Sequence, residues 1–201
     1  MAVRAAAPEV VLGVQILSGG NREAIAVALA AGAQFIRCEI FVFSHIADEG
    51  LLERAEAGEL LRYRRAIGAE HIRVFADIKK KHASHAITAD VTVADAVEGA
   101  AFFGADGVII TGTATGKAAA EADLAAARSA AEKAGAGGAG NPPLAVLVGS
   151  GVTPENAAAM LNHADSLIVG SFIKEDGRWE NGVCRERAGR MLAAVSAAPV
   201  R

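Results

Sequence analysis

Two short glycine–serine segments lie in the last third of the chain. Gly149-Ser150-Gly151 follows the apolar run 144–148, and Gly170-Ser171 follows the apolar run 167–169. Glycine lets the backbone turn sharply and approach a ligand closely, and the N–H groups that open a following helix bind anions. Lys174 lies three residues beyond the second segment and can neutralise negative charge. We therefore expect these six residues to bind the phosphate group of a small molecule, although a single turn of this kind also occurs without a ligand.

Asp77 and Lys79 lie at the end of another apolar run, residues 72–78. Side chains alternate along a β-strand, so Asp77 and Lys79 are expected on one face and Ile78 on the other. An aspartate and a lysine in this arrangement shift the pKa of each other and can transfer protons. A structural ion pair in a polar layer is an equally good interpretation of the same two residues.

Glu39 and His82 are further candidates for acid–base chemistry. Glu39 shares a strand face with Arg37, for which a structural ion pair is the favoured role, and is itself a candidate acid, base or metal ligand. His82 ends the basic segment 79–82 and is a candidate acid or phosphate partner. His85 follows three residues later, but the two histidines have no third ligand at a fixed spacing. We therefore predict no metal site and no cofactor; a divalent metal ion is compatible with the pattern but not indicated by it.

A hydroxyl-rich segment, residues 111–117, follows the apolar run 107–111. Its glycines and lysine are similar to those of a nucleotide-binding loop, but Ala118 stands where that motif requires serine or threonine after the lysine. We interpret the segment as a wall of the binding pocket, in which Thr111, Gly112 and Thr115 contact the ligand.

Apolar runs alternate with helical segments along the chain, which predicts an α/β fold with a parallel sheet. The predicted strands span residues 10–17, 35–41, 72–78, 107–111, 144–148 and 166–169. Several of them are almost continuous runs of Val, Ile, Leu and Ala, as expected for parallel strands covered by helices. The predicted helices span residues 22–31, 49–67, 93–103, 121–134, 154–162 and 185–195. Thr153 and Pro154 are a strong helix start, and Asp48 is a candidate cap for the helix near residue 49. One domain over residues 1–201 accounts for this pattern.

The composition argues against several functions. The chain has 201 residues, a net charge of −3 and 4% aromatic residues, so we expect no nucleic-acid partner. No apolar stretch reaches the roughly 18 residues of a membrane span, and the N-terminus lacks the apolar core of a signal peptide. The two cysteines, Cys38 and Cys184, do not suggest a disulfide framework. We therefore predict a cytoplasmic protein and leave a homo-oligomer open.

Several strings, in order along roughly residues 10–195, together resemble the BtpA family. They are Gly13-Val-Gln-Ile-Leu17, Phe35-Ile-Arg-Cys-Glu39, His45-Ile-Ala-Asp-Glu-Gly50, Glu59-Leu-Leu-Arg-Tyr-Arg64, Phe75-Ala-Asp-Ile-Lys-Lys-Lys-His82, Thr111-Gly-Thr-Ala-Thr-Gly116, Val148-Gly-Ser-Gly-Val-Thr-Pro154 and Ile168-Val-Gly-Ser171. The resemblance implies a (β/α)8 TIM barrel of the ribulose-phosphate-binding type. Family members carry about two further strand–helix units before the strand near residue 10, so we expect an incomplete barrel whose six units are strands three to eight.

Two hypotheses for the function follow. The first is an enzyme acting on a phosphorylated sugar or similar metabolite, in which Asp77 and Lys79 move protons and Glu39 and His82 assist. Isomerase, lyase and glycosyl-transfer chemistry all remain open for such an enzyme. The second is a non-catalytic assembly factor, because the resemblance is to a family named for a role in building up photosystem I in cyanobacteria.

Overall fold

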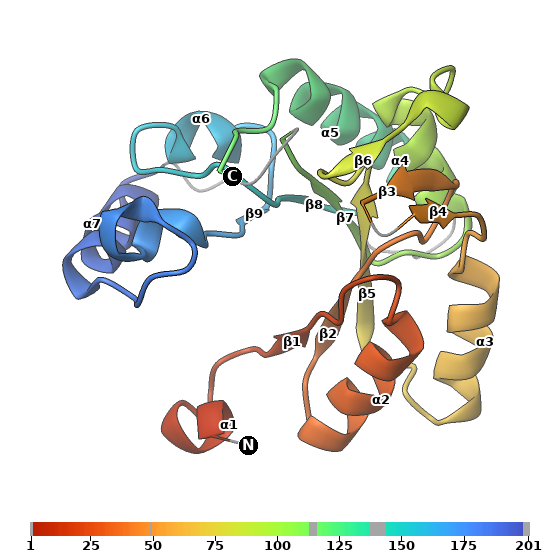
Figure 1. Ribbon diagram of the computed structural model, residues 1–201, viewed down its shortest axis with the longest axis horizontal. Helices are drawn as coiled ribbons and strands as arrows, with labels where there is room; N and C mark the ends of the chain where they lie inside the picture. Colours follow the sequence, from red (N-terminus) through yellow and green to blue (C-terminus); the bar gives the residue numbers. More distant parts are fainter. Residues whose placement is uncertain (1, 49, 113–115, 137–143, 199–201) are drawn as a thin grey trace.

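A computed structural model describes residues 2–48, 50–112, 116–136 and 144–198 of the chain. Its main sheet has six strands, all parallel and joined in the order β1-β2-β5-β7-β8-β9. The strands are β1 (Gly13–Val14), β2 (Phe35–Cys38), β5 (Arg73–Ile78), β7 (Gly107–Ile110), β8 (Ala145–Val148) and β9 (Ser166–Leu167). The sheet curls without closing, so that β1 and β9 remain at opposite edges (Figure 1). The fold is thus an incomplete α/β barrel, as the resemblance implied.

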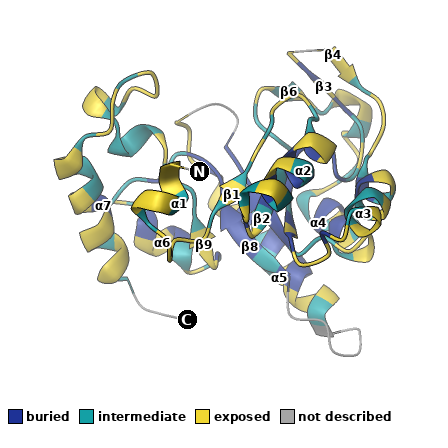
Figure 2. Ribbon diagram, turned by 90° about the horizontal axis from the view of Figure 1, so that it is seen from below, coloured by how far each residue is buried: buried dark blue, intermediate teal, exposed yellow. Residues whose placement is uncertain are grey.

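Helices follow the strands and cover the convex face of the sheet (Figure 1). They are α2 (Asn21–Ala31), α3 (Ala57–Ala66), α4 (Val93–Phe102), α5 (Glu121–Ala136), α6 (Ala157–Leu161) and α7 (Arg185–Ser196), and a short helix α1 (Ala2–Ala6) precedes β1. Burial is greatest in the central strands and in the helix faces turned toward them, whereas α1 and most of α7 are exposed (Figure 2). Within the described ranges, no helix has both the length and the apolar character needed to cross a membrane.

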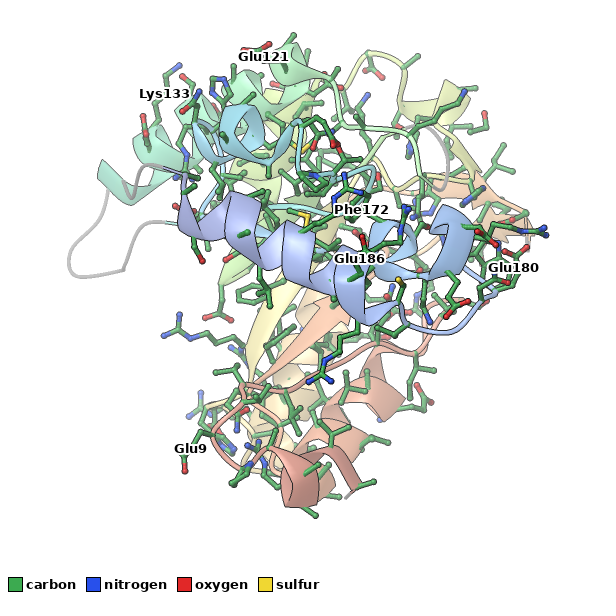
Figure 3. The ribbon with its side chains drawn as sticks, turned by 90° about the vertical axis from the view of Figure 1, so that its left-hand side faces the viewer. Glu9, Glu121, Lys133, Phe172, Glu180 and Glu186 are labelled. Atoms are coloured by element: carbon green, nitrogen blue, oxygen red, sulfur yellow. The ribbon has the colours of Figure 1, made fainter. Side chains whose placement is uncertain are left out.

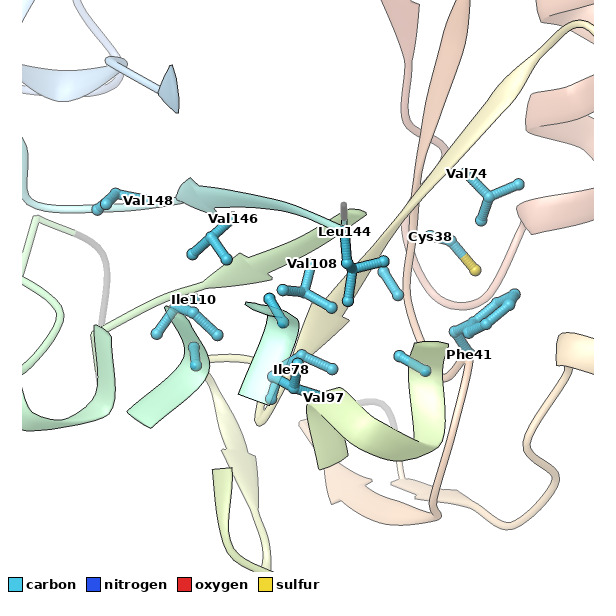
Figure 4. Packing of buried hydrophobic residues seen from close by; sticks show 14 of the residues in the cluster. Cys38, Phe41, Val74, Ile78, Val97, Val108, Ile110, Leu144, Val146 and Val148 are labelled. Carbon is cyan, nitrogen blue, oxygen red and sulfur yellow. The ribbon is translucent and has the colours of Figure 1, made fainter. Parts of the chain in front are cut away.

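The apolar core lies between the convex face of the sheet and the helices. Neighbouring strands contribute fully buried residues in register, with Ile36 opposite Val74 and Val108 opposite Val146. Val97 of α4 packs against this layer in the same cluster (Figure 4). Alternate residues of each strand point instead to the concave face, where the rings of Phe35 and Phe75 lie 5.1 Å apart. The polar residues of this second set are therefore the ones available to a site.

A small antiparallel sheet lies beyond the carboxyl ends of β2 and β5, and the sequence did not predict it. It consists of β3 (His45–Ala47), β4 (Gly50–Leu52) and β6 (Ala83–Ser84), in the order β4-β3-β6. The prediction of a helix over 49–67 is therefore wrong in its first part, because α3 begins at Ala57. Asp48 consequently lies at the β3–β4 turn and does not cap a helix. A short apolar run such as Leu51-Leu52 fits a helix and a strand equally well, and pairing with β3 decides the outcome.

The other predicted strands are present with shorter bounds, whereas helices α2, α5 and α7 extend one or two residues beyond their predicted bounds. The first and last strands have two residues each, where 10–17 and 166–169 were expected. The prediction of Thr153 as a helix cap is wrong, because α6 starts only at Ala157 with Asn156 as its N-cap; a turn precedes it, in which the Ala157 N–H donates to the Thr153 carbonyl over 3.0 Å. Edge strands have one partner each, so their hydrogen-bonded length is set by β2 and β8.

Candidate functional site

A cavity of about 440 Å³ lies at the carboxyl ends of the last two strands, β8 and β9. All six residues that the sequence predicts for phosphate binding line it: Gly149, Ser150, Gly151, Gly170, Ser171 and Lys174. Because parallel strands end at one edge of the sheet, the two segments meet there although twenty-one residues separate Gly149 from Gly170. The structure therefore brings this group together.

Four cationic side chains line the same cavity: Arg37, Lys81, Lys174 and Arg187. No aspartate or glutamate occurs among its described lining residues. Clustered charge of one sign in a concave site concentrates ligands of the opposite sign. Lys81 and Arg187 were not identified from the sequence, because neither belongs to a ligand-binding motif. The arrangement is suited to an anionic ligand.

The Gly149–Gly151 turn is held mainly by the protein itself. The Gly149 N–H donates to the Ile110 carbonyl over 2.8 Å and so continues the sheet. The buried Ser150 hydroxyl accepts from the Gly112 N–H at 2.8 Å and donates to the Lys117 carbonyl at 3.0 Å. In this structure the hydroxyl links the turn to Gly112 and Lys117, and its expected contact with a ligand stays a prediction.

Gly151 and Gly112 are required by close backbone packing. Gly151 has a φ of +68°, and a Cβ atom there would lie 2.2 Å from the Ala118 nitrogen. At Gly112 a Cβ atom would lie 2.2 Å from the Lys117 carbonyl oxygen. These two glycines let residues 117–118 cross the turn, which explains them without a ligand.

Thr111 supports the site from behind. Its hydroxyl accepts a hydrogen bond of 3.1 Å from the Lys81 backbone N–H, and the side chain is almost fully buried. Neither Thr111 nor Gly112 is among the described residues that line the cavity, and their expected contacts with a ligand stay predictions. Thr115 lies outside the described residues.

The second glycine–serine segment leads into a single 3-10 turn, Ser171–Ile173, and is steadied by helix α7. Arg187 of α7 donates from Nε to the Phe172 carbonyl over 2.6 Å, and its guanidinium lies 4.5 Å from the centre of the Phe172 ring. Figure 3 shows Phe172 next to the end of α7 that carries Glu186. These contacts fix the guanidinium at the cavity wall, next to Ser171 and Lys174.

Asp77 is paired with Arg37 of the neighbouring strand. Arg37 Nε lies 3.1 and 3.0 Å from the two carboxylate oxygens, and a terminal guanidinium nitrogen lies 2.9 Å from Oδ1. The Asp77 side chain is 1% exposed and that of Arg37 16% exposed, so Arg37 faces the cavity and Asp77 lies behind it. Burial raises the pKa of Asp77, while the Arg37 charge acts in the opposite direction.

Lys79 does not form the expected pair with Asp77. Strand β5 ends at Ile78, and Lys79 has a φ of +46°, which ends the alternation on which that prediction rested. The charges of Arg37, Glu39 and Lys80 act on the Asp77 carboxyl, and the Asp77 charge acts on Lys81, whereas the charge of Lys79 acts on Asp95 of α4. Lys79 lines a much smaller cavity, which it shares with Asp77.

Lys81 is the lysine of this segment that reaches the large cavity. Its side chain is half-buried, and across the described ranges no residue forms an ion pair or hydrogen bond with its ammonium group. Burial lowers the pKa of Lys81, the Arg37 charge lowers it further, and the Asp77 charge raises it. A lysine in this state exchanges its proton more readily than an ordinary surface lysine.

Glu39 is buried in a network of its own. Its Oε2 lies 3.2 Å from the Lys80 ammonium and accepts from the Gly19 N–H over 3.3 Å, and Gln15 donates to Oε1 over 3.4 Å. The buried Asn21 amide donates to the Glu39 carbonyl at 2.7 Å and accepts from the Glu39 N–H at 3.1 Å. Glu39, one residue beyond β2, thus pairs with Lys80 and not with Arg37.

The histidines His45, His82 and His85 are not among the described residues that line the large cavity. His82 is exposed and has a φ of +57°, while the His85 ring lies 5.5 Å from that of His45. No group of three or more His, Cys, Asp or Glu residues with the geometry to hold a metal ion occurs in the ranges that the structure covers. His82 therefore stays a prediction as an auxiliary acid.

Strained backbone is concentrated in the loops after the first three parallel strands. Five non-glycine residues there have positive φ angles: Ser18, Ile40, Phe43, Lys79 and His82. Outside these loops, Asp176 alone among the described non-glycine residues has a positive φ. Such strain persists where the surrounding structure enforces it and is enriched at ligand-binding sites.

Solved structures with a similar fold support the barrel assignment. KGPDC from Streptococcus mutans aligns with a TM-score of 0.57 at 12% identity, covering 97% of this chain and 76% of that chain. The 3-hexulose-6-phosphate synthase from Salmonella typhimurium aligns with a TM-score of 0.55 at 14% identity, covering 97% of this chain and 77% of its own. At these identities the likeness shows the fold alone.

Sequence relatives are closer. An uncharacterised mitochondrial protein of Caenorhabditis elegans is 42% identical over 94% of this chain and 64% of its own length. An uncharacterised protein of Pyrococcus furiosus is 36% identical over 88% of this chain and 62% of its own. The photosystem I biogenesis protein BtpA of Synechocystis is 32% identical over 92% of this chain and 60% of its own. The chain thus spans under two thirds of the length of these relatives. Residues 3–197 match the BtpA family as a whole, and the chain belongs to that family.

Proposed function

We propose that this protein binds a phosphorylated small molecule, a sugar phosphate or a similar metabolite, in the cavity at the ends of β8 and β9. The observation that carries the proposal is the lining of that cavity: four cationic side chains and two glycine–serine turns, with no carboxylate among its described lining residues. One protein of similar fold is named as a synthase of a hexulose 6-phosphate, which is consistent with this class of ligand.

The phosphate group would bind between the Gly170–Ser171 turn and the side chains of Lys174 and Arg187. Ser171 and Ser150 both line the cavity, but the Ser150 hydroxyl already bonds Gly112 and Lys117 within the protein. Arg187 is held by Phe172 before any ligand arrives, so little side-chain entropy is lost on binding. In this proposal the Gly149–Gly151 turn forms part of the cavity wall, and the Gly170–Ser171 turn contacts the phosphate group.

A role in catalysis is the second part of the proposal. Lys81 lines the cavity and has a lowered pKa, so it is our candidate for the group that exchanges a proton with the ligand. Asp77 would act through Arg37 as a positioning residue, and Glu39 would position Lys80. Isomerase, lyase and glycosyl-transfer chemistry remain open for residues 1–201, which we treat as one domain acting in the cytoplasm.

An assembly role is the alternative, and one observation favours it. A relative that is 32% identical is named as a photosystem I biogenesis protein. In that case the chain would hold a protein partner, and the cavity would bind small phosphorylated ligands weakly or not at all. Recovery of a stoichiometric protein partner from cells, together with absent binding of sugar phosphates, would favour this alternative.

The phosphate site is tested by calorimetry with fructose 6-phosphate and, as control ligand, fructose. We expect Lys174→Met and Arg187→Met each to weaken binding of fructose 6-phosphate by about tenfold or more, since each removes a charged hydrogen-bond donor. Arg190→Met is the matched control, because Arg190 lies 5.6 Å from the same Phe172 ring but pairs with the exposed Glu155 and is not a described lining residue. Equal affinities for fructose and its phosphate would contradict the proposal.

A further inference from the structure

The cationic residues of the cavity form two groups at opposite ends. Lys174 and Arg187 lie with the Gly170–Ser171 turn beyond β9, whereas Arg37 lies on β2 and Lys81 follows β5. In the sheet, β5 is three steps from β9, through β7 and β8. At about 4.8 Å for each step, the strands that lead to the two groups are about 14 Å apart (β5 to β9) and about 19 Å apart (β2 to β9). The two groups therefore enter the cavity from separate strands, and we treat them as two places for an acidic group.

The Arg37 end has more positive than negative charge. Asp77 is the carboxylate that pairs with Arg37, and it occupies Nε and one terminal nitrogen of the guanidinium. The remaining guanidinium nitrogen and the Lys81 ammonium make no hydrogen bond or ion pair with any residue in the described ranges. Both side chains nevertheless line the cavity in a half-buried position.

Two cations that line one cavity repel each other when they are partly removed from water. Arg37 and Lys81 line the same cavity, and the Arg37 charge lowers the pKa of Lys81, whereas the Asp77 charge raises it. An anion between them would relieve the repulsion, and it would form charge-assisted hydrogen bonds with two preplaced donors. The same argument does not apply to Lys80, whose charge is already matched by Glu39 at 3.2 Å.

We infer that the ligand of this cavity carries a second acidic group, a carboxylate or a second phosphate, which binds between Arg37 and Lys81 while the first phosphate binds at Lys174 and Arg187. This inference rests on the proposed function and narrows it. The substrate class is then a sugar bisphosphate or a phosphorylated sugar acid, not a simple sugar monophosphate.

Calorimetry at fixed ionic strength tests the inference with four probes: fructose 6-phosphate, fructose 1,6-bisphosphate, 6-phosphogluconate and gluconate. We expect at least one of the two doubly acidic probes to bind about tenfold or more tightly than fructose 6-phosphate, and gluconate to bind weakly. The bisphosphate and the phosphorylated acid distinguish a second phosphate from a carboxylate.

Lys81→Met should abolish this gain, and the doubly acidic probes should lose more affinity than fructose 6-phosphate, which has no second acidic group. Lys81→Arg, which keeps the charge, should retain the gain. It provides a second test of the subsite if the methionine variant folds poorly. Lys79→Met is the matched control two residues away, since Lys79 is outside the described lining of the large cavity. It should retain the gain in full.

The outcomes separate the inference from the proposed function. If fructose 6-phosphate binds and neither doubly acidic probe binds more tightly, the second subsite does not exist but the phosphate site stands. If a gain is present and survives Lys81→Met, the second acidic group binds elsewhere and the inference is overturned. If no phosphorylated probe binds, both the inference and the proposed function fail.

Discussion

Arg37 covers the buried carboxylate of Asp77 and separates it from the cavity. The guanidinium contacts both carboxylate oxygens at 3.0 and 3.1 Å, and it is the arginine, not the aspartate, that lines the cavity wall. A ligand in the cavity therefore meets the positive guanidinium, although the pair as a whole is neutral. Removing either partner leaves the charge of the other unpaired in a buried position.

Arg37→Met should destabilise the fold by about 3–5 kcal/mol, because it leaves a buried carboxylate without its partner. Urea unfolding at neutral pH measures the change. The double variant Arg37→Met with Asp77→Leu should recover most of the loss, since no buried charge remains. A single variant as stable as the parent would show that the pair contributes nothing to folding.

Ser150→Ala should cost about 1–3 kcal/mol of stability, because the buried Gly112 N–H loses its acceptor. Thermal or urea unfolding provides the measurement, and Ser129→Ala on the exposed face of α5 is a control expected to be neutral. The affinity for fructose 6-phosphate should fall by less than about threefold. A large loss of affinity with unchanged stability would instead show that the Ser150 hydroxyl binds the ligand directly.

Gly151→Ala should be among the most damaging alanine substitutions in the chain. The new Cβ atom would lie 2.2 Å from the Ala118 nitrogen, and the φ of +68° is unfavourable for alanine, so we expect a loss of about 2 kcal/mol or more. Gly189→Ala provides the contrast, because Gly189 lies in α7 with nothing within 4 Å of the added atom. That helix substitution should be neutral or stabilise by up to about 1 kcal/mol. Similar results for the two variants would argue against the packing described for Gly151.

The gain in affinity from a second acidic group should depend on pH through Lys81. Its pKa in the folded protein is lowered from 10.5, so its charge disappears as the pH rises through the lowered value. As the pH is raised, the gain measured by calorimetry should therefore start to decline in the parent before pH 10.5 is reached. It should persist in Lys81→Arg, since arginine stays charged. Unfolding stability should change in the opposite sense: the unfavourable charge is fully present below the folded pKa and is relieved as the pH rises from there toward 10.5. A gain that falls equally in both proteins would contradict the assignment to Lys81.

The parallel sheet and the cavity turns could be predicted from the sequence for a physical reason. Parallel strands are apolar on both faces and give long, recognisable runs, and glycine–serine segments after the last two such runs must meet at one edge of the sheet. The six residues from Gly149 to Lys174 therefore come together as expected. What they contact could not be read from the pattern: the Ser150 hydroxyl bonds Gly112 and Lys117, which lie more than thirty residues away in the sequence.

The lysine at the cavity could not be predicted by alternation. Side chains alternate between the two faces only within a strand, and the positive φ of Lys79 ends this alternation one residue after β5. As a result, Lys80 reaches Glu39 and Lys81 lines the cavity. Arg187 left no local signal either, because its position depends on the packing of α7 against Phe172. The β3–β4 hairpin was missed because strands of three residues carry too little periodicity to be distinguished from a helix.

The central claim is that a phosphate group binds between the Gly170–Ser171 turn, Lys174 and Arg187. A crystal structure of the protein soaked with fructose 6-phosphate tests it most directly. The account predicts density for the phosphate within hydrogen-bonding distance of Ser171 and of the Lys174 and Arg187 side chains, and loss of that density in Arg187→Met. Phosphate density elsewhere, or none at a concentration that saturates binding in solution, would contradict it.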